Sequence, residues 1–306
     1  MTIEETATAI KDMSIRGAGK IARACASALY ELAESYDGDD PEEFMEMLED
    51  AKNDLIASRP TAVSLYNGVM YSLKGIGKWM DVEEMRREVM NNADEFIKDS
   101  IQAVKTIGEL GAEIVDDGDV IMTHCNSSAA LSVIKEAHAQ GKNIKVYATE
   151  TRPWRQGLIT VRQLAEAGVD VTLIVDSAVR LVMEDVDKVF VGADTITAQG
   201  TLFNKVGTSQ LALAANELDV PFYVCTESYK FSPMSLNSDN VRIEVRETAE
   251  IVKEGEVPKE VKIYNPVFDR TPAKFIDTII TEKGGISPYK ARDFIIEQFG
   301  IKEEVH

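Results

Sequence analysis

The hydrophobic pattern of this 306-residue chain changes near residue 116, and this change most constrains the fold. Before it, apolar residues recur at three- and four-residue spacing, as on the buried sides of helices. After it, short β-branched runs alternate with helical stretches, which is typical of a parallel sheet with crossover helices. The pattern predicts an α/β protein with two domains, a helical one at 1–115 and a doubly wound one at 116–306.

The expected elements follow from these two patterns. In the first domain we expect helices at 15–36, 41–58, 60–80 and 82–111. In the second we expect strands at 120–123, 144–148, 171–175, 188–191, 221–225 and 275–281, and helices at 129–140, 156–168, 209–218 and near 289–299. This order predicts a Rossmann-like α/β domain, in which ligands bind beyond the carboxyl ends of the strands.

The charge balance narrows the class of partner. The chain has 52 Asp and Glu against 33 Lys and Arg, a formal charge of -19. Such a charge repels nucleic acid unless cations gather on one face, and the sequence has no basic run of that kind. We therefore expect no nucleic-acid partner, and an anionic substrate would need a local group of cations and backbone amides.

Metal, membrane and export signals are missing from the sequence pattern. The three cysteines and three histidines have no paired metal-ligand spacing, so we expect no dedicated zinc site. No apolar run of 18 residues occurs, and the first residues lack a secretory signal. We expect a soluble, cytoplasmic protein.

Two residues that follow predicted strands are candidates for proton transfer. Cys125 follows the first strand, where a helix start favours the thiolate and an anionic substrate would oppose it, and the sequence does not decide between them. Asp194 follows the strand at 188–191, where a desolvated carboxylate can trade protons near neutral pH. Cys125 could instead be a small buried apolar residue, and Asp194 could instead cap the following turn through a side-chain hydrogen bond. His124 should not activate the thiol, because neighbours on a strand point to opposite faces.

Two glycine-containing segments could bind phosphate. Asn204 and Lys205 precede Gly207 and hydroxyl residues where a helix is expected to open, which is typical of an anion site but also of an ordinary helix cap. Arg16, Gly17, Ala18 and Gly19 have the same character in the helical domain, and Arg59 precedes a proline that restricts it to extended backbone. Arg59 could also be only a helix-boundary residue.

These motifs together resemble one superfamily over nearly the whole chain. It comprises methylthioribose-1-phosphate isomerase, archaeal ribose-1,5-bisphosphate isomerase and the regulatory subunits of translation initiation factor 2B. The Cys125 and Asp194 pair resembles the isomerase branches, and Arg-Gly-Ala-Gly-Lys at 16–20 resembles the bisphosphate enzyme. The segments that carry the resemblance are 16–19, 59–63, 124–127, 150–153, 156–157, 192–194 and 204–208.

The resemblance implies a function for these residues. It implies conversion of α-D-ribose 1,5-bisphosphate to D-ribulose 1,5-bisphosphate in archaeal AMP degradation, with Cys125 as proton acceptor and Asp194 as proton donor. It also implies that no metal, nicotinamide or other cofactor is needed, and that the protein is a cytoplasmic homohexamer built as a trimer of dimers. The implied substrate contacts are Arg16, Gly17, Ala18, Gly19, Arg59, Ser127, Ser128, Ala129, Asn204, Lys205 and Lys230.

Two alternatives stay open from sequence. A methylthioribose-1-phosphate isomerase would use the same thiol and carboxylate but needs an apolar pocket where the bisphosphate enzyme needs a basic one. Lys230 and Arg59 are the positions that should discriminate between them. A non-catalytic regulatory subunit would bind a sugar phosphate or nucleotide without turnover.

Overall fold

A computed structural model describes residues 1–237 and 241–301. The chain forms two compact units, Met1–Ala103 and a second that begins at Val104. The division lies inside the long helix α5 (Val82–Ala112), earlier than the boundary expected at 115. The reason is that Ile107 and Ala112, near the end of α5, are buried in the core of the sheet-containing unit.

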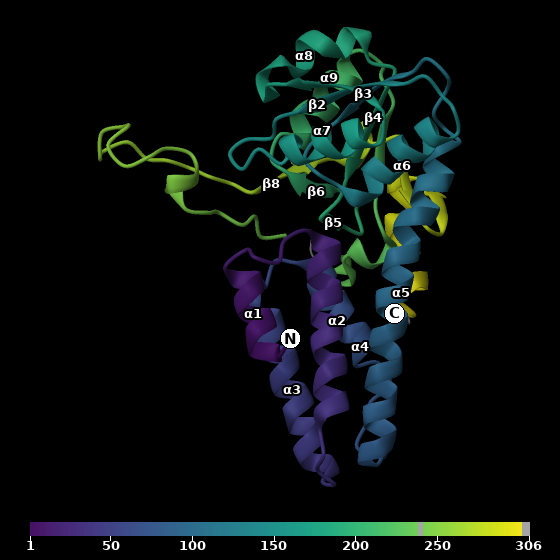
Figure 1. Cartoon of the computed structure of the whole chain (residues 1–306), viewed down its shortest axis with the longest axis vertical. Helices are drawn as coiled ribbons and strands as arrows, with labels where there is room; N and C mark the ends of the chain where they lie inside the picture. Colours follow the sequence, from purple (N-terminus) through teal and green to yellow (C-terminus); the bar gives the residue numbers. More distant parts are fainter. Residues whose placement is uncertain (238–240, 302–306) are drawn as a thin grey trace. The chain divides into compact units, whose positions relative to one another are not determined.

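The first unit is helical, as the periodicity predicted. It contains α1 (Ile3–Lys11), α2 (Ala18–Ser35), α3 (Pro41–Ser58), α4 (Val63–Ser72) and most of α5 (Figure 1). The apolar faces of these helices meet in one core that includes Ile21, Leu29, Phe44, Leu55 and Leu65.

Two helix limits in this unit differ from the expectation. The helix α1 was not expected, and Thr2 starts it with a capping box in which its side chain accepts from the Glu5 amide. The helix expected at 60–80 ends at Ser72, because the chain turns through Gly75, whose φ of 80° suits glycine.

The second unit is built on a seven-stranded sheet of order β10-β9-β7-β4-β1-β2-β3. Every pairing is parallel except that of β9 with β10. The expected Rossmann-like α/β fold is confirmed. The strands are β1 (Val120–Thr123), β2 (Lys145–Thr149), β3 (Asp170–Ile174), β4 (Lys188–Gly192), β7 (Phe222–Cys225), β9 (Thr278–Thr281) and β10 (Gly284–Ile286).

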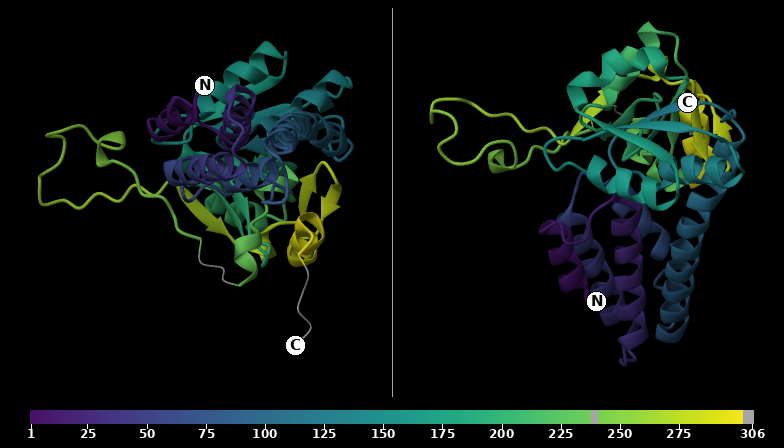
Figure 2. Two further views of the ribbon diagram at one scale, coloured as in Figure 1. Left: turned by 90° about the horizontal axis from the view of Figure 1, so that it is seen from below. Right: turned by 45° about the horizontal axis from the view of Figure 1, so that its top comes forward.

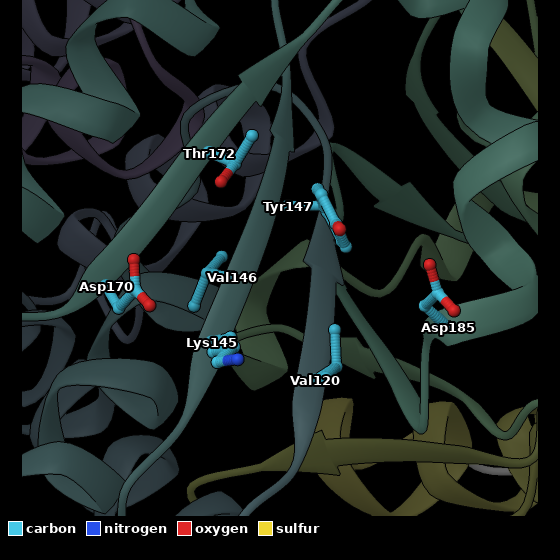
Figure 3. Close-up of a pocket in the computed structure, with 7 residues that line it drawn as sticks. All are labelled: Val120, Lys145, Val146, Tyr147, Asp170, Thr172 and Asp185. Carbon is cyan, nitrogen blue, oxygen red and sulfur yellow. The ribbon is translucent and has the colours of Figure 1, made fainter.

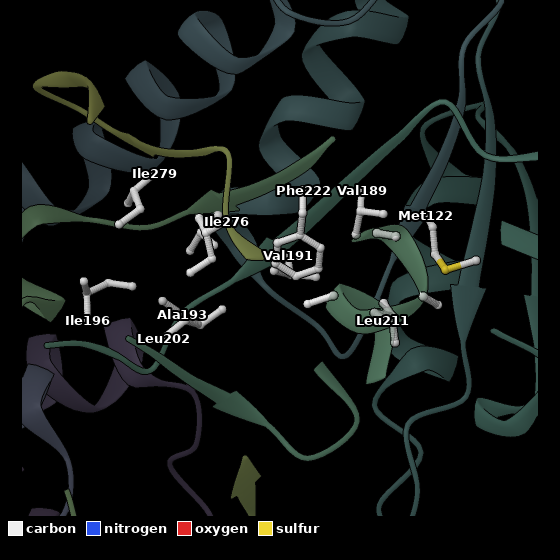
Figure 4. Close-up of a cluster of buried hydrophobic side chains, with 14 of the residues drawn as sticks. Met122, Val189, Val191, Ala193, Ile196, Leu202, Leu211, Phe222, Ile276 and Ile279 are labelled. Atoms are coloured by element: carbon white, nitrogen blue, oxygen red, sulfur yellow. The ribbon is translucent and has the colours of Figure 1, made fainter. Parts of the chain in front are cut away.

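Helices cover both faces of this sheet. Successive residues of β4 point to opposite faces, and each face packs against different helices. Val189 and Val191 belong to one core, with residues of α9 (Thr208–Glu217) and α10 (Ala291–Phe299) (Figure 4). Phe190 belongs to the other core, with residues of α6 (Ser128–Ala139) and α7 (Gly157–Glu166). A strand buried on both faces reads as a continuous apolar run, as β4 does.

A second, three-stranded sheet was not expected from the sequence. It has the order β5-β6-β8 and consists of β5 (Thr195–Ile196), β6 (Leu202–Lys205) and β8 (Phe268–Thr271). Between β7 and β8, residues 241–266 form an extended excursion without α-helix (Figures 1 and 2). The pairing of β6 with β8 therefore joins segments more than 60 residues apart, which local patterns do not reveal.

Candidate active site

Cys125 and Asp194 follow neighbouring strands at the reversal point of the sheet. From β1 the chain moves outward through β2 and β3, then returns to pair β4 on the other side of β1. Met122 is paired with Val189, and Cys125 lies two residues beyond Thr123, where β1 ends, while β4 ends at Gly192. Asp194 follows two residues later. Ligands of doubly wound sheets bind in the crevice at this reversal point.

The backbone of Cys125 has an unusual conformation that its neighbours hold in place. Its φ of 67° lies in the left-handed region, which non-glycine residues seldom adopt. Its amide donates to the Thr151 Oγ1 at 2.9 Å, and its carbonyl accepts from the Thr160 Oγ1 at 2.6 Å. Residues held this way cluster at functional sites.

Burial raises the pKa of the Cys125 thiol to about 11. The charge of Lys205 and the backbone hydrogen bond of Asn126 act in the opposite direction, while the charges of Asp194 and Asp176 raise the pKa further. Desolvation is the largest of these effects and therefore decides the direction of the shift. Lys205, Asp194 and Asp176 are thus the charged side chains that act on the thiol.

Asp194 is half-buried and lies two residues after Gly192, the last residue of β4. Its amide donates to the Phe203 carbonyl at 3.0 Å, which joins the turn after β4 to β6 of the small sheet. The backbone of Asp194 is therefore fixed while its carboxylate stays partly exposed. This is the placement that a group exchanging protons with a bound substrate requires.

The start of α6 lies beside Cys125 and is capped by its own sequence. The Ser127 Oγ accepts from the Ala130 amide at 3.3 Å. Ser128 and Ala129 form the first turn, whose amides point along the axis toward the carboxyl ends of the strands. A helix start of this kind attracts anions.

Lys205 and Asn204 lie at the end of β6, not in the opening turn of a helix as expected. Both are buried, and the Lys205 Nζ lies 5.3 Å from the centroid of the Phe268 ring. The Asn204 Nδ2 donates to the Thr208 Oγ1 at 3.0 Å. The lysine is thus held on a rigid strand rather than on a flexible loop.

At the start of α9, the helix that follows Lys205, the backbone amides donate to a carboxylate side chain of the protein itself. The Asp269 carboxylate accepts from the Gly207 amide at 2.7 Å and from the Ser209 amide and hydroxyl at 3.2 and 2.8 Å. Burial raises the pKa of Asp269 despite these bonds. The amides that were expected to form a phosphate cradle here are therefore occupied by a side chain from β8, which the sequence pattern did not indicate.

Lys230 forms a buried ion pair. Its Nζ lies 2.7 Å from the Glu227 Oε2, and the Tyr229 hydroxyl donates to the Glu227 Oε1 at 3.1 Å. Burial of Glu227 opposes ionisation, but Lys230 and the hydrogen bonds outweigh it and lower the carboxyl pKa. Both charges follow β7, the strand next to β4.

The remaining candidates belong to the helical unit. Gly17 has a φ of 92° and precedes α2 as its N-cap, and the Ser64 Oγ donates to the Ala18 carbonyl at 3.0 Å. Arg59 is the C-cap of α3. Arg16 and Gly19 flank the same α2 start, so one helix N-terminus carries this whole segment. Their contact with a substrate stays a prediction.

Asp176 is a further residue of the site that the sequence pattern did not single out. It follows β3 and accepts from the Thr151 amide at 2.8 Å and from the Arg152 amide at 2.7 Å. Thr151 in turn binds the Cys125 amide. The rule that selected Cys125 and Asp194, residues just after a strand, would also have selected Asp176.

A separate hollow lies at the opposite ends of the strands. It has a volume of about 250 Å³ and is lined by the first residues of β1, β2 and β3, including Val120, Lys145 and Asp170 (Figure 3). Cys125 lies beyond the other end of β1, so this hollow is not the candidate site.

Within residues 1–237 and 241–301, no group of three or more His, Cys, Asp or Glu could hold a metal ion. No helix in the described part of the chain is long and apolar enough to cross a membrane.

The fold and the site together define a Rossmann-like α/β protein with a helical N-terminal unit and a thiol and a carboxylate at the reversal point of its sheet. Residues 14–288 match the Initiation factor 2 subunit family. The chain belongs to this family.

Relatives of known name include both isomerases and translation factors. The chain is 51% identical to the ribose 1,5-bisphosphate isomerase of Methanocaldococcus jannaschii, over 99% of this chain and 97% of the relative. It is 38% identical to a putative methylthioribose-1-phosphate isomerase of Archaeoglobus fulgidus, over 94% and 88%. The crystal structure of Pyrococcus horikoshii translation initiation factor eIF-2B matches with a TM-score of 0.81 at 33% identity, over 94% of this chain and 97% of that one.

Proposed function

We propose that this enzyme converts α-D-ribose 1,5-bisphosphate to D-ribulose 1,5-bisphosphate, with Cys125 and Asp194 as its proton-transfer pair. One observation carries the proposal: the thiol and the carboxylate follow adjacent parallel strands at the reversal point of the sheet, and the charge of Lys205 acts on the same thiol. The similarity to archaeal ribose 1,5-bisphosphate isomerases, 40–51% over nearly the whole chain, supports the choice of substrate.

The isomerisation can be written with balanced proton movements. Asp194 gives a proton to the ring oxygen as the bond from C1 to that oxygen breaks. The Cys125 thiolate takes the proton on C2, and a C1–C2 double bond forms, giving an enol phosphate. The C2 hydroxyl then returns a proton to Asp194 while Cys125 delivers its proton to C1. The product is a C2 ketone, and both residues regain their starting protonation.

The raised thiol pKa sets a requirement for this reaction. With a pKa of about 11, only about one Cys125 in 10⁴ is ionised at pH 7. The thiolate is then formed rarely. Because it is strongly basic, however, it removes a proton from carbon more readily than a thiolate of low pKa would. We propose that Lys205, the cation that lowers this pKa, stabilises the thiolate when it forms.

Two phosphates need two separated anion sites. We propose that the start of α6 at Ser127, Ser128 and Ala129 binds one phosphate through backbone amides. Lys205, Asn204 and Lys230 would add donors on the same unit. The Arg16 to Gly19 segment and Arg59 would supply the other site from the helical unit. Because the Lys230 charge is balanced by Glu227, we expect it to contribute hydrogen bonds more than net charge.

Phosphorus NMR with α-ribose 1,5-bisphosphate tests the proposal. Wild-type protein should produce ribulose 1,5-bisphosphate, whereas Cys125→Ser and Asp194→Asn should lose turnover by at least about 10²-fold, the usual scale for general acid–base groups. Turnover by both variants at the wild-type rate would reject the residue assignment and leave the substrate assignment intact.

A methylthioribose-1-phosphate isomerase is the second candidate, because relatives of that name are 38–39% identical over more than 90% of this chain. The two substrates differ where one carries a phosphate and the other an apolar group. Substitution of Arg59 or Lys230 should therefore impair bisphosphate turnover more than turnover of a methylthio substrate. Equal losses on both would contradict this. Binding of either sugar phosphate without turnover would favour a regulatory subunit.

We also propose, on the strength of the family resemblance, a cytoplasmic homohexamer arranged as a trimer of dimers that acts in AMP degradation. Light scattering of the purified protein tests the assembly. A mass near six times 33.8 kDa is expected, and a monomer or dimer at micromolar concentration would reject the hexamer.

A further inference from the structure

His124 is a buried, titratable side chain beside Cys125 that the proposed reaction does not use. It follows β1 directly and is 1% exposed. Its Nδ1 lies 2.6 Å from the Thr149 Oγ1, and its Nε2 lies 2.9 Å from the Val206 carbonyl oxygen. It therefore links the ends of β1 and β2 to the segment just after Lys205.

The proton positions on this ring follow from its partners. A carbonyl oxygen only accepts, so the Nε2 carries the hydrogen. Burial lowers the pKa of His124 to about 4, and Lys205 acts in the same direction, outweighing the Val206 bond and the charge of Asp176. The ring is neutral at pH 7, and the Nδ1 accepts the hydrogen of the Thr149 hydroxyl.

This assignment fixes which groups donate and which accept in the hydrogen bonds that join His124 to the Cys125 amide. The Thr149 Oγ1 lies 3.2 Å from the Thr151 Oγ1, and having donated to His124 it can only accept from the Thr151 hydroxyl, which also lies 3.4 Å from the Thr149 carbonyl oxygen. The Thr151 Oγ1 accepts from the Cys125 amide at 2.9 Å. The series runs from Cys125 through Thr151, Thr149 and His124 to Val206 without a donor facing a donor.

Packing adds to this hydrogen-bonded series. A Cβ on Gly207 would lie 2.8 Å from the Cε1 of His124, so the ring contacts the turn directly after Val206. At the other end, Cys125 has a φ of 67°, a conformation that persists only where neighbours impose it. One imidazole thus contacts the segment that carries the lysine and, through two threonines, the cysteine backbone.

We propose that His124 is a positioning residue for this isomerase: it fixes the left-handed backbone of Cys125 relative to Lys205 through the Thr149 and Thr151 hydroxyls. The catalytic part of this inference rests on the proposed function. The side chain transfers no proton itself, because both nitrogens are engaged inside the protein. A misplacement of the thiol by about 1 Å would cost on the order of 10²-fold in rate.

Two substitutions separate positioning from bulk packing. His124→Phe keeps a planar ring but neither nitrogen, whereas His124→Gln keeps one donor and one acceptor on its amide. We expect His124→Phe to lower kcat about 10²-fold with KM changed less than about threefold, and His124→Gln to recover at least about tenfold of the loss. With substrate deuterated at C2, the isotope effect on kcat should rise in His124→Phe, because removal of the C2 proton becomes slower than other steps.

A second pair of variants tests the same series without touching the ring. Thr151→Val removes the hydroxyl, and Thr151→Ser keeps it, so the valine variant should resemble His124→Phe and the serine variant wild type. This pair keeps the inference testable if His124→Phe does not fold. His138→Phe, on α6, is the control for loss of a histidine in the same unit and should keep wild-type kcat.

The pH dependence of kcat distinguishes positioning from proton transfer by His124. The charged groups that act on the ring are Asp176 and Lys205. If His124 only positions Cys125, kcat of the His124→Phe variant should be lower than that of wild type at every pH, and the acidic and basic limbs of its pH profile should both remain. Loss of either limb would overturn the inference. Wild-type kcat in His124→Phe, or equal inactivity of folded His124→Phe and His124→Gln, would also overturn it.

A measurement independent of turnover separates this inference from the proposed function. Cys125 alkylation by iodoacetamide, followed by peptide mass spectrometry, reports the environment of the thiol whether or not the protein isomerises a sugar. We expect the rate in His124→Phe to differ from wild type at least about threefold and to return toward it in His124→Gln. Unchanged alkylation in both variants would overturn the positioning role, while absent turnover by wild type would reject only the proposed function.

Discussion

Gly192 and Ser127 are packed so closely that a Cβ on Gly192 would lie 2.3 Å from the Ser127 Oγ and 2.4 Å from its Cβ. The end of β4, which leads to Asp194, therefore contacts the N-cap of α6, which follows Cys125. The absence of a side chain at Gly192 allows the two candidate groups to come from strands that are directly paired.

Gly192→Ala should consequently destabilise the protein by about 1–3 kcal/mol, the usual cost of overpacking, and lower kcat/KM by displacing the α6 start. Chemical denaturation and steady-state kinetics measure the two effects. The exchange variant Ser127→Gly with Gly192→Ala removes the atoms that clash and keeps a tolerated N-cap residue, so it should recover most of the stability. No recovery would contradict the packing explanation.

Lys230→Met should destabilise the fold by about 3–5 kcal/mol, because it leaves the buried Glu227 carboxylate without its cation. The double variant with Glu227→Gln removes the uncompensated charge and should regain at least half of the loss. Urea denaturation of the single and double variants measures this. A single variant as stable as wild type would show that the pair is not held in the buried arrangement.

The lowered pKa of Glu227 also has a consequence for acid stability. A carboxyl whose folded pKa lies below its unfolded value of about 4.5 stabilises the fold above that pH, and this contribution is lost as the pH falls through the folded pKa. The free energy of unfolding should therefore decrease below about pH 4.5, less steeply in Glu227→Gln than in wild type. Equal slopes in the two proteins would contradict the shift.

The alkylation rate of Cys125 should rise about tenfold per pH unit from pH 7.5 to 9.5, because its thiol pKa is raised to about 11. The Lys205 charge lowers this pKa, so Lys205→Met should move the profile to higher pH; Asp194 raises it, so Asp194→Asn should move the profile to lower pH. Mass spectrometry of the Cys125 peptide follows the reaction. A plateau already at pH 8 would rule out a thiol protonated by burial.

Asp176→Ala should destabilise the protein by about 1–3 kcal/mol, because the amides of Thr151 and Arg152 lose their acceptor. Activity should fall as well, since Thr151 binds the Cys125 amide. Asp176→Asn keeps one acceptor oxygen and should show about half of the loss. Thermal unfolding and kcat/KM measure both, and an unaffected Asp176→Ala variant would remove Asp176 from the site.

Most of the large sheet could be predicted because local sequence determines it. The β-branched runs after residue 120 matched β1, β2, β3, β4 and β7 to within one residue at most ends, and the change to helical spacing matched α6, α7 and α9. The small sheet could not be predicted, because β6 pairs with β8 across a long excursion and its pairing energy is non-local.

The sequence determined that Cys125 and Asp194 share one edge of the molecule, because both directly follow parallel strands and the carboxyl ends of such strands meet. The tertiary structure decided the electrostatics around the thiol. Burial, which depends on every surrounding element, raises the Cys125 pKa. Asp269, arriving from β8, occupies the amides that the local pattern assigned to phosphate, and Glu227 balances Lys230. Strand positions follow from local patterns, whereas desolvation and charge pairing depend on distant residues that only the folded chain brings together.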